Sequence, residues 1–326
     1  MLAATIFTGA AVGAGVLQAS PGAAVDEMAV NAGAQSVVSG ADVNARPASV
    51  SRGAQGSGDL APATQTSQHG SEQTSTKAPP PEPGDPFSFR IGTLNILGSQ
   101  HKGGGTKRAS ALAGAIRDRG VDIVGMQEVQ DDQLAVLQDR RPGYTIWPGK
   151  SLGNQGVRLQ IAWRDSMFSL VDTGSITTTF DHQQRPIPWV RLENRASGGQ
   201  FYVIDVHNSP RDQEGARDSA TSEEIELIKR LRNTGKPVFI LGDTNEHTEF
   251  FCRVAASTGM VASNGASHSG DCNTGSGPIK VDWVMGTGGE VDFSRHVVDY
   301  NDPVRYATDH AFVHARVQVA SMKRRG

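Results

Sequence analysis

The sequence predicts an α+β protein in which helices cover mixed β-sheets. A strand, a helix and a second strand are expected in succession within 87–126, and a long series of strand-like segments follows, separated by Gly, Pro and Asp residues. A second amphipathic helix is expected to interrupt this series at 219–232. Helices mixed with many strands in one chain are typical of a layered α+β domain.

The first three elements have distinct patterns. Phe87–Ile96 alternates in polarity and is rich in β-forming residues, which predicts the first strand. Lys107–Arg119 has apolar residues at helical spacing, and Gly120 is expected to end this helix. Val121–Met126 is a short, mostly apolar run, as expected for a buried strand.

The later elements are mostly strands. Candidates before the second helix are Thr145–Pro148, Leu159–Arg164, Phe168–Ser175, Ile187–Glu193 and Phe201–Val206. The second helix, Ser219–Arg232, has an apolar face. Three further strands are expected at Lys236–Gly242, Ile279–Met285 and His310–Val319.

Only the part of the chain after residue 86 has the composition of a folded domain. All four Trp and all four Tyr residues follow this point, so we expect one domain over 87–320 and a short basic tail at 321–326. Residues 31–86 are dominated by small and polar residues and end in a Pro-rich stretch, which predicts a disordered linker. Residues 1–30 contain an apolar, Ala- and Gly-rich run. It resembles a secretory signal or a weak anchor, although no Lys or Arg precedes it, and a disordered leader is the alternative.

Net charge and cysteine content limit the class of protein. The formal net charge is −3, and the predicted domain is nearly neutral, so the chain does not resemble a protein that coats nucleic acid non-specifically. A local basic patch remains compatible with this balance. Cys252 and Cys272 are the two cysteines, and they form either one disulfide or two separate buried thiols. We expect the bridge, which together with the leader predicts a secreted or surface-tethered protein.

Polar residues recur at or just beyond the predicted strands. They are Asn95, Glu128, His207, Asp243, Asn245, Asp282, Asp309 and His310. Taken singly, each has an ordinary explanation: Gly-Asp-Thr-Asn is a turn sequence, and an Asp-His pair can cap a helix. Their joint occurrence beside apolar strands predicts one shared site, because strand ends at one edge of a sheet lie close together.

The motifs that contain these residues resemble a known family. They are Thr93–Asn95, Gly125–Glu128, the strand ending in His207, Gly242–Asn245, Val281–Trp283 and Thr308–His310. In this order they are similar to the signatures of the endonuclease/exonuclease/phosphatase superfamily, which is deoxyribonuclease I-like. The resemblance covers about 87–320 and suggests a bacterial secreted member. It implies a four-layered α/β/β/α sandwich, a site at one edge of the paired sheets, and a divalent cation, usually magnesium.

The resemblance also implies metal ligands. Glu128 is expected to be the main ligand, assisted by Asn95 and Asp309. Oxygen ligands suit a hard cation such as Mg²⁺ or Mn²⁺, and the sequence has no Cys/His cluster that would indicate zinc.

Catalytic roles follow from the same resemblance. His310 is expected to act as base or phosphate contact and to be oriented by Asp282, since a carboxylate fixes the tautomer of a bonded imidazole. Asp243 and Asn245 are expected to position the attacking water and to bind phosphate oxygens. His207 is expected to protonate the leaving oxygen or to bind phosphate.

Two further residues each have two possible assignments from sequence. Asp205 lies two residues before His207 on the same strand face, so it is a candidate acid partner for that histidine, with a structural role as the alternative. Arg185 resembles a phosphate-contacting arginine of the deoxyribonuclease branch, and the alternative is a surface arginine before an edge strand.

These features lead us to expect a metal-dependent phosphoester hydrolase, with a secreted, monomeric nuclease as the first hypothesis and nucleic acid as its substrate. A phospholipid or small-molecule phosphodiesterase is the second hypothesis, and an inactive binding module is the third. Substrate choice is expected to depend on the loops Ser99–Lys107, Gly149–Val157 and Ala262–Gly277. Lys102, Lys107 and Arg108 are candidate contacts to a nucleic-acid backbone.

Overall fold

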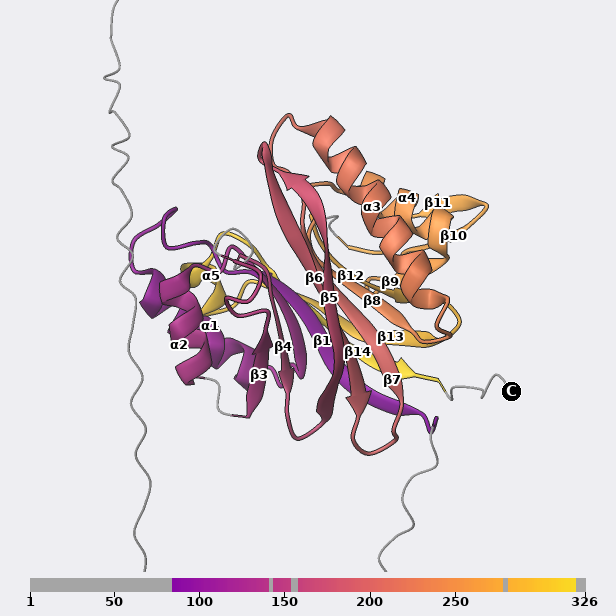
Figure 1. Cartoon of the computed structure of the whole chain (residues 1–326), viewed down its shortest axis with the longest axis horizontal. Coiled ribbons are helices and arrows are strands. Elements are labelled where there is room, and N and C mark those ends of the chain that lie inside the picture. Colours follow the sequence, from indigo (N-terminus) through magenta and orange to yellow (C-terminus); the bar gives the residue numbers. More distant parts are fainter. Residues whose placement is uncertain (1–83, 141–142, 154–157, 278–280, 321–326) are drawn as a thin grey trace, which may run out of the picture. The chain divides into compact units, whose positions relative to one another are not determined.

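The computed structural model describes residues 84–140, 143–153, 158–277 and 281–320, which form two six-stranded sheets packed face to face (Figure 1). The predicted leader, the basic tail and nearly all of the predicted linker lie outside the described residues. No helix in the described ranges is both long and apolar enough to cross a membrane.

The first sheet has the strand order β13-β14-β1-β2-β4-β3. Its strands are β1 (Phe87–Asn95), β2 (Ile123–Gln127), β3 (Tyr144–Trp147), β4 (Gln160–Arg164), β13 (Val291–Asp299) and β14 (Phe312–Val319). Helices α1 (Gly105–Asp118), α2 (Asp131–Arg140) and α5 (Val304–Ala307) lie along this sheet (Figure 1).

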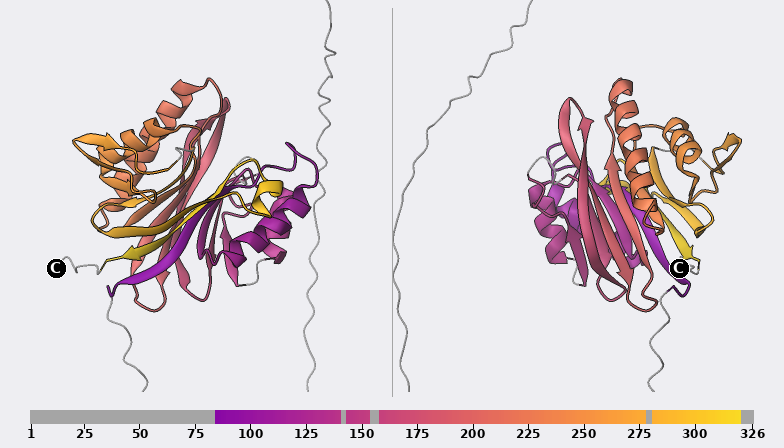
Figure 2. Two further views of the ribbon diagram at one scale, coloured as in Figure 1. Left: turned by 180° about the vertical axis from the view of Figure 1, so that it is seen from behind. Right: turned by 45° about the vertical axis from the view of Figure 1, so that its right-hand side comes forward.

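The second sheet has the order β5-β6-β7-β8-β12-β9. Its strands are β5 (Phe168–Phe180), β6 (Gln183–Asn194), β7 (Gln200–His207), β8 (Val238–Asp243), β9 (Met260–Ala262) and β12 (Asp282–Thr287). Helices α3 (Glu214–Arg232) and α4 (Thr248–Thr258) cover the face turned away from the first sheet (Figure 2). A small hairpin of β10 (Ser267–Ser269) and β11 (Asp271–Asn273) packs against α4.

Three apolar clusters separate the four layers. The central cluster lies between the sheets and contains packed aromatic rings, including those of Phe89, Phe168, Phe201 and Phe239. One further cluster joins the first sheet to α1 and α2, and another joins the second sheet to α3 and α4. This arrangement confirms the predicted α/β/β/α sandwich.

The register of the parallel strands brings the polar strand ends to one edge. Strand β1 runs parallel to β2, and Asn95 is paired with Gln127 at their ends. In the second sheet, Asp243 at the end of β8 is paired with His207 on one side and with Asp282 on the other. The sheet hydrogen bonding therefore places these three ionisable side chains on neighbouring strands.

Most predicted elements are present, with shifted bounds. Strand β5 continues five residues beyond the predicted Ser175, to Phe180, because it pairs with β6 through a long hairpin. Helix α3 begins at Glu214 rather than Ser219. Helices α2 and α4 and strand β13 were not predicted. Many side chains of β13 are exposed to solvent, so its sequence lacks the regular apolar pattern of a buried strand.

The two cysteines form a disulfide, as predicted. Cys252 on α4 is bonded to Cys272 on β11, with 5.6 Å between their Cα atoms. In the chain-entropy description a loop of this length contributes roughly 3 kcal/mol to stability. The bridge fixes the small hairpin to α4, so the loop Ala262–Gly277 packs against this helix.

Candidate active site

A cleft of about 550 Å³ opens at the edge where the polar strand ends converge. It is lined by Glu128, His207, Asp243, Asn245, Asp309 and His310, together with basic and aromatic side chains from surrounding loops. The predicted site residues on different segments are therefore brought to one cavity. Asn95 and Asp282 lie behind this wall, buried and in contact with the lining residues.

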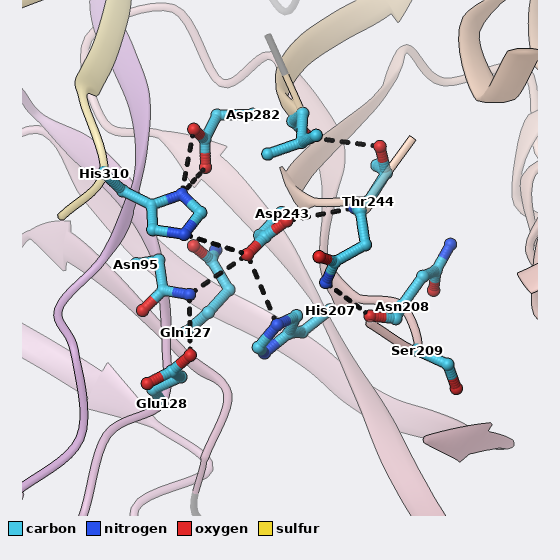
Figure 3. Close-up of polar contacts among 12 residues, drawn as sticks. Asn95, Gln127, Glu128, His207, Asn208, Ser209, Asp243, Thr244, Asp282 and His310 are labelled. Atoms are coloured by element: carbon cyan, nitrogen blue, oxygen red, sulfur yellow. Dashed lines mark hydrogen bonds and ion pairs between the residues drawn. The ribbon is translucent and has the colours of Figure 1, made fainter. Parts of the chain in front are cut away.

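Asp243 is the centre of this arrangement. Its Oδ2 atom lies 3.1 Å from Asn95 Nδ2, 3.3 Å from His207 Nε2 and 3.5 Å from His310 Nε2 (Figure 3). The residue is 1% exposed. Burial alone would raise its pKa, but the two histidines and Asn95 outweigh burial and lower the pKa to about 2. Asp243 therefore remains an ionised hydrogen-bond acceptor at neutral pH.

The predicted pairing of His310 with Asp282 is present. His310 Nδ1 lies 3.0 Å from Asp282 Oδ1 and 3.1 Å from Oδ2, and its Nε2 atom points to Asp243 (Figure 3). Burial lowers the pKa of His310, but the hydrogen bond and charge of Asp282, with help from Asp243 and Asp309, raise it to about 9. The imidazole is thus held in one orientation by acids on both ring nitrogens.

Glu128 and Asn95 form the second part of the site. Asn95 Nδ2 donates to Glu128 Oε1 at 3.0 Å, and the backbone N–H of Gly98 donates to Glu128 Oε2 at 2.9 Å. Burial opposes ionisation of Glu128, yet these hydrogen bonds and the nearby histidines together lower its pKa. Glu128 also has a φ of 63°, a left-handed conformation that costs energy for a residue other than glycine and is common at functional sites.

Asn245 is held at the wall of the cleft by its backbone and its amide. Its N–H donates to Asp243 Oδ1 at 3.0 Å, and its Nδ2 donates to the Asn208 carbonyl at 2.8 Å. Its φ of 52° is left-handed, which asparagine tolerates better than most residues. The preceding turn requires Gly242, because a Cβ atom there would collide with the Val206 carbonyl.

The acid in contact with His207 is Asp243 and not Asp205, so Asp205 is not the partner of that histidine and the alternative, a structural role, agrees with the structure. Asp205 is fully buried, and its Oδ1 atom accepts a hydrogen bond from Gln127 Nε2 at 2.6 Å. Its strand face points to the first sheet, where Gly125 leaves room for the carboxylate. His207 Nε2 reaches across to the neighbouring strand, and its ring lies 4.5 Å from that of Phe180.

Two arginines lie on the same wall of the cleft as His207. Arg185 is half-buried on β6, with its guanidinium 4.6 Å from the ring centroid of Phe180. Arg158, which precedes β4, lines the same wall and donates to Gln100 Oε1 at 3.0 Å. Burial and the charge of Arg158 both lower the pKa of Arg185. The sequence did not identify Arg158 as a site residue. The one feature that could have indicated it is its position directly before a predicted strand.

Of the three basic residues expected to contact nucleic acid, Lys102 lines the cleft and the other two do not. Lys107 lies at a groove between α1 and α2. Arg108 is 7% exposed and points inward to backbone carbonyls. Among the three loops expected to surround the site, Ser99–Lys107 contributes Gln100, His101 and Lys102 to the cleft, whereas Ala262–Gly277 packs on α4. Residues 154–157 of the loop Gly149–Val157 lie outside the described residues.

The donor atoms suit a hard divalent cation. The carboxylates of Glu128 and Asp309 line the cleft, and Asn95 contacts Glu128 through its Nδ2 atom, while its Oδ1 atom accepts a hydrogen bond from the Leu97 N–H at 3.0 Å. Oxygen donors of this kind fit Mg²⁺ or Mn²⁺. A tighter group of possible ligand atoms, those of Asp243, Asp282 and His310, lies within 4.8 Å, but these atoms are already paired with one another.

Comparisons with known proteins agree with this geometry. The sequence model of the Endonuclease/Exonuclease/phosphatase family matches residues 92–322, so the chain belongs to that family, whose members hydrolyse phosphoesters. Among curated proteins, none matches the chain significantly.

Solved structures with low sequence identity share the fold. An endonuclease/exonuclease/phosphatase family protein from Bacteroides thetaiotaomicron is 19% identical, with a TM-score of 0.60 over 72% of this chain and 99% of the other. A mannosyl-6-phosphatase from the same organism is 18% identical, with a TM-score of 0.56 over 71% and 99%. D. rerio TDP2, solved with a single-strand DNA product, is 15% identical, with a TM-score of 0.55 over 71% and 98%.

Proposed function

We propose that this protein is a divalent-metal-dependent nuclease that cleaves phosphodiester bonds by in-line attack of water. The observation that carries the proposal is the position of Asp243 Oδ2, which lies within 3.5 Å of Asn95, His207 and His310 at the floor of one cleft. An ionised carboxylate between two imidazoles can orient a water molecule and is flanked by proton donors for phosphate oxygens.

Each residue has a role that follows from its position. Water held by Asp243 and Asn245 forms the new phosphorus–oxygen bond and passes a proton to Asp243. His310, kept protonated by Asp282, donates a hydrogen bond to a nonbridging oxygen. The bond to the leaving oxygen breaks, and His207 donates a proton to that oxygen. Glu128, Asn95 and Asp309 would hold Mg²⁺ or Mn²⁺, which supplies positive charge for the phosphate oxygens.

The basic wall of the cleft supports a polymeric substrate. Arg158 and Arg185 make no ion pair with a carboxylate among the described residues, and the Arg185 Nε atom is buried without a hydrogen-bond partner. Guanidinium groups bind phosphate oxygens in fixed geometry, so phosphates next to the scissile one can be contacted here. Lys102 extends the same positive charge to the rim.

A substrate panel tests the proposal. The purified full chain is incubated with supercoiled plasmid, RNA, sphingomyelin and a phosphomonoester, each with Mg²⁺ or with EDTA. We expect Mg²⁺-dependent cleavage of a nucleic acid. Cleavage confined to sphingomyelin or to the monoester would move the substrate to the phospholipid or small-molecule class, and absence of cleavage on every substrate would support an inactive binding module.

We also propose that the protein acts outside the cytoplasm, attached or secreted through residues 1–30. The Cys252–Cys272 disulfide supports export, because disulfides persist mainly in oxidising compartments. Fractionation of cells that express a C-terminally tagged full chain tests this, and a protein found wholly in the cytosol would contradict it.

A further inference from the structure

Arg108 on α1 is a buried cation whose guanidinium is bonded to backbone carbonyls. It is 7% exposed and forms no ion pair among the residues of the described ranges. The carbonyls that accept its N–H groups are Ile96 at 3.0 Å, Leu97 at 2.7 Å, Ala307 at 2.8 Å, Lys102 at 2.9 Å, Gly98 at 3.3 Å and Gly103 at 3.4 Å. One side chain therefore joins three segments of the chain, 96–98, 102–103 and 307.

The first and third of these segments adjoin the proposed metal ligands. Segment 96–98 directly follows Asn95, and its Gly98 N–H donates to Glu128 Oε2 at 2.9 Å. Ala307 precedes Thr308 and Asp309, and the Thr308 hydroxyl donates to the Asn95 carbonyl at 2.7 Å. The ligands come from positions far apart in the sequence, and Arg108 and Thr308 each join the Asn95 segment to the Asp309 segment.

The second segment, 102–103, forms part of the rim of the cleft. Lys102 lines the cleft beside His101, whose Nε2 atom lies 3.6 Å from Glu128 Oε2. The bonds from Arg108 to the carbonyls of Lys102 and Gly103 hold this loop against α1.

We propose that Arg108 is a positioning residue for the divalent-cation site, fixing the Asn95–Glu128 pair relative to Asp309. The proposal rests on the proposed function, because it takes these residues as the cation ligands. Arginine is required since a planar guanidinium presents five N–H donors in a fixed fork, whereas the lysine ammonium has three donors at one point. Arg108→Lys keeps the charge but leaves several of the six carbonyls without a donor.

Cation binding in the absence of substrate provides the test. Full-length wild type, Arg108→Lys and Arg164→Lys are titrated with Mn²⁺ by isothermal calorimetry, and folding is checked by circular dichroism. Arg164 is the matched control, because it bonds Asp122 at 2.8 Å at the opposite end of the same sheet. Changes in residues that support metal ligands typically weaken affinity by about 10- to 100-fold. We expect a loss of that size for Arg108→Lys and none for Arg164→Lys.

Kinetics separate positioning from a substrate contact. At saturating Mn²⁺, Arg108→Lys should recover most of kcat with KM for the nucleic acid close to that of wild type. A raised KM with unchanged Mn²⁺ affinity would show instead that Arg108 acts on substrate binding, and unchanged Mn²⁺ affinity with only a lower melting temperature would show a purely structural role. Either result overturns the proposal.

A second variant covers failure of the first to fold. Thr308→Val removes the other bond between the two ligand-bearing segments, so it should also weaken Mn²⁺ binding. If Arg108→Lys does not fold, wild-type Mn²⁺ affinity in Thr308→Val overturns the inference. Failure of the proposed function has a different signature, because the wild type itself would then neither bind Mn²⁺ nor cleave nucleic acid.

Discussion

Glu224, a buried acid on α3, should make the stability of this protein fall as the pH rises. The residue is fully buried, its Oε2 atom accepts one long hydrogen bond of 3.4 Å from Asn208, and its Oε1 atom has no hydrogen-bond partner. Burial, with a smaller contribution from Glu246, raises the pKa of Glu224 from 4.5 to about 8. The native state therefore binds a proton that the unfolded state has released between these two pH values.

The size and sign of the effect follow from proton linkage. Because the native state holds the additional proton, the contribution of Glu224 to the free energy of unfolding falls by up to about 1.4 kcal/mol per pH unit between pH 4.5 and 8 and is level above that range. Glu224→Gln removes this dependence. Its amide can also donate to the unpaired Asn208 Oδ1 atom, as protonated Glu224 can. The variant should match wild type near pH 5 and be more stable at pH 8, by about 1 to 4 kcal/mol.

Urea unfolding at half-unit pH steps measures this difference. Glu223→Gln is the matched control, because Glu223 is the exposed neighbour on the same helix and should give a difference that does not change with pH. A Glu224→Gln variant whose advantage is the same at pH 5 and pH 8, or that is less stable at both, would refute the assignment of a neutral buried Glu224.

Three further predictions concern the site. Glu128→Gln keeps the side-chain shape but removes the ligand charge, so calorimetry should show Mn²⁺ affinity lowered by more than the roughly 100-fold typical of supporting residues. Asp282→Asn should lower kcat by about 10²- to 10⁴-fold. NMR titration of the metal-free variant should show the pKa of His310 falling from about 9 toward its ordinary value. An unchanged pKa would mean that other groups hold the imidazole. Arg158→Ala should weaken nucleic-acid binding and reduce the slope of log K against log salt by about one unit, while hydrolysis of a small phosphodiester stays the same.

Much of the fold could be predicted from the chain because its signals are local. Alternation in Phe87–Asn95, helical spacing in α1 and the apolar run of β8 each specify an element without reference to distant residues. Helix α4 was missed although it has buried Phe250 and Phe251. Its apolar residues do recur at helical spacing, but its adjacent aromatic residues also suit a strand, and packing on the second sheet decides the conformation.

The candidate site was predictable as a set of residues but not as a set of contacts. The order of motifs carried the resemblance to the family, and that resemblance implied the His310–Asp282 pair. The meeting of Asn95, His207 and His310 at one oxygen of Asp243 depends on registers between strands in two different sheets. No local pattern encodes those registers.

The sequence by itself determined the layered α+β class, the polar strand ends and the cysteine pair available for a disulfide. Tertiary structure alone decided which side chains face the cleft. Asp205 points into the space between the sheets, and Arg108 points toward backbone carbonyls. The sequence alone made both residues candidates for the site. The physical reason is that a polar side chain is directed by the hydrogen-bond partners around it, and those partners lie on segments that only the folded chain brings near.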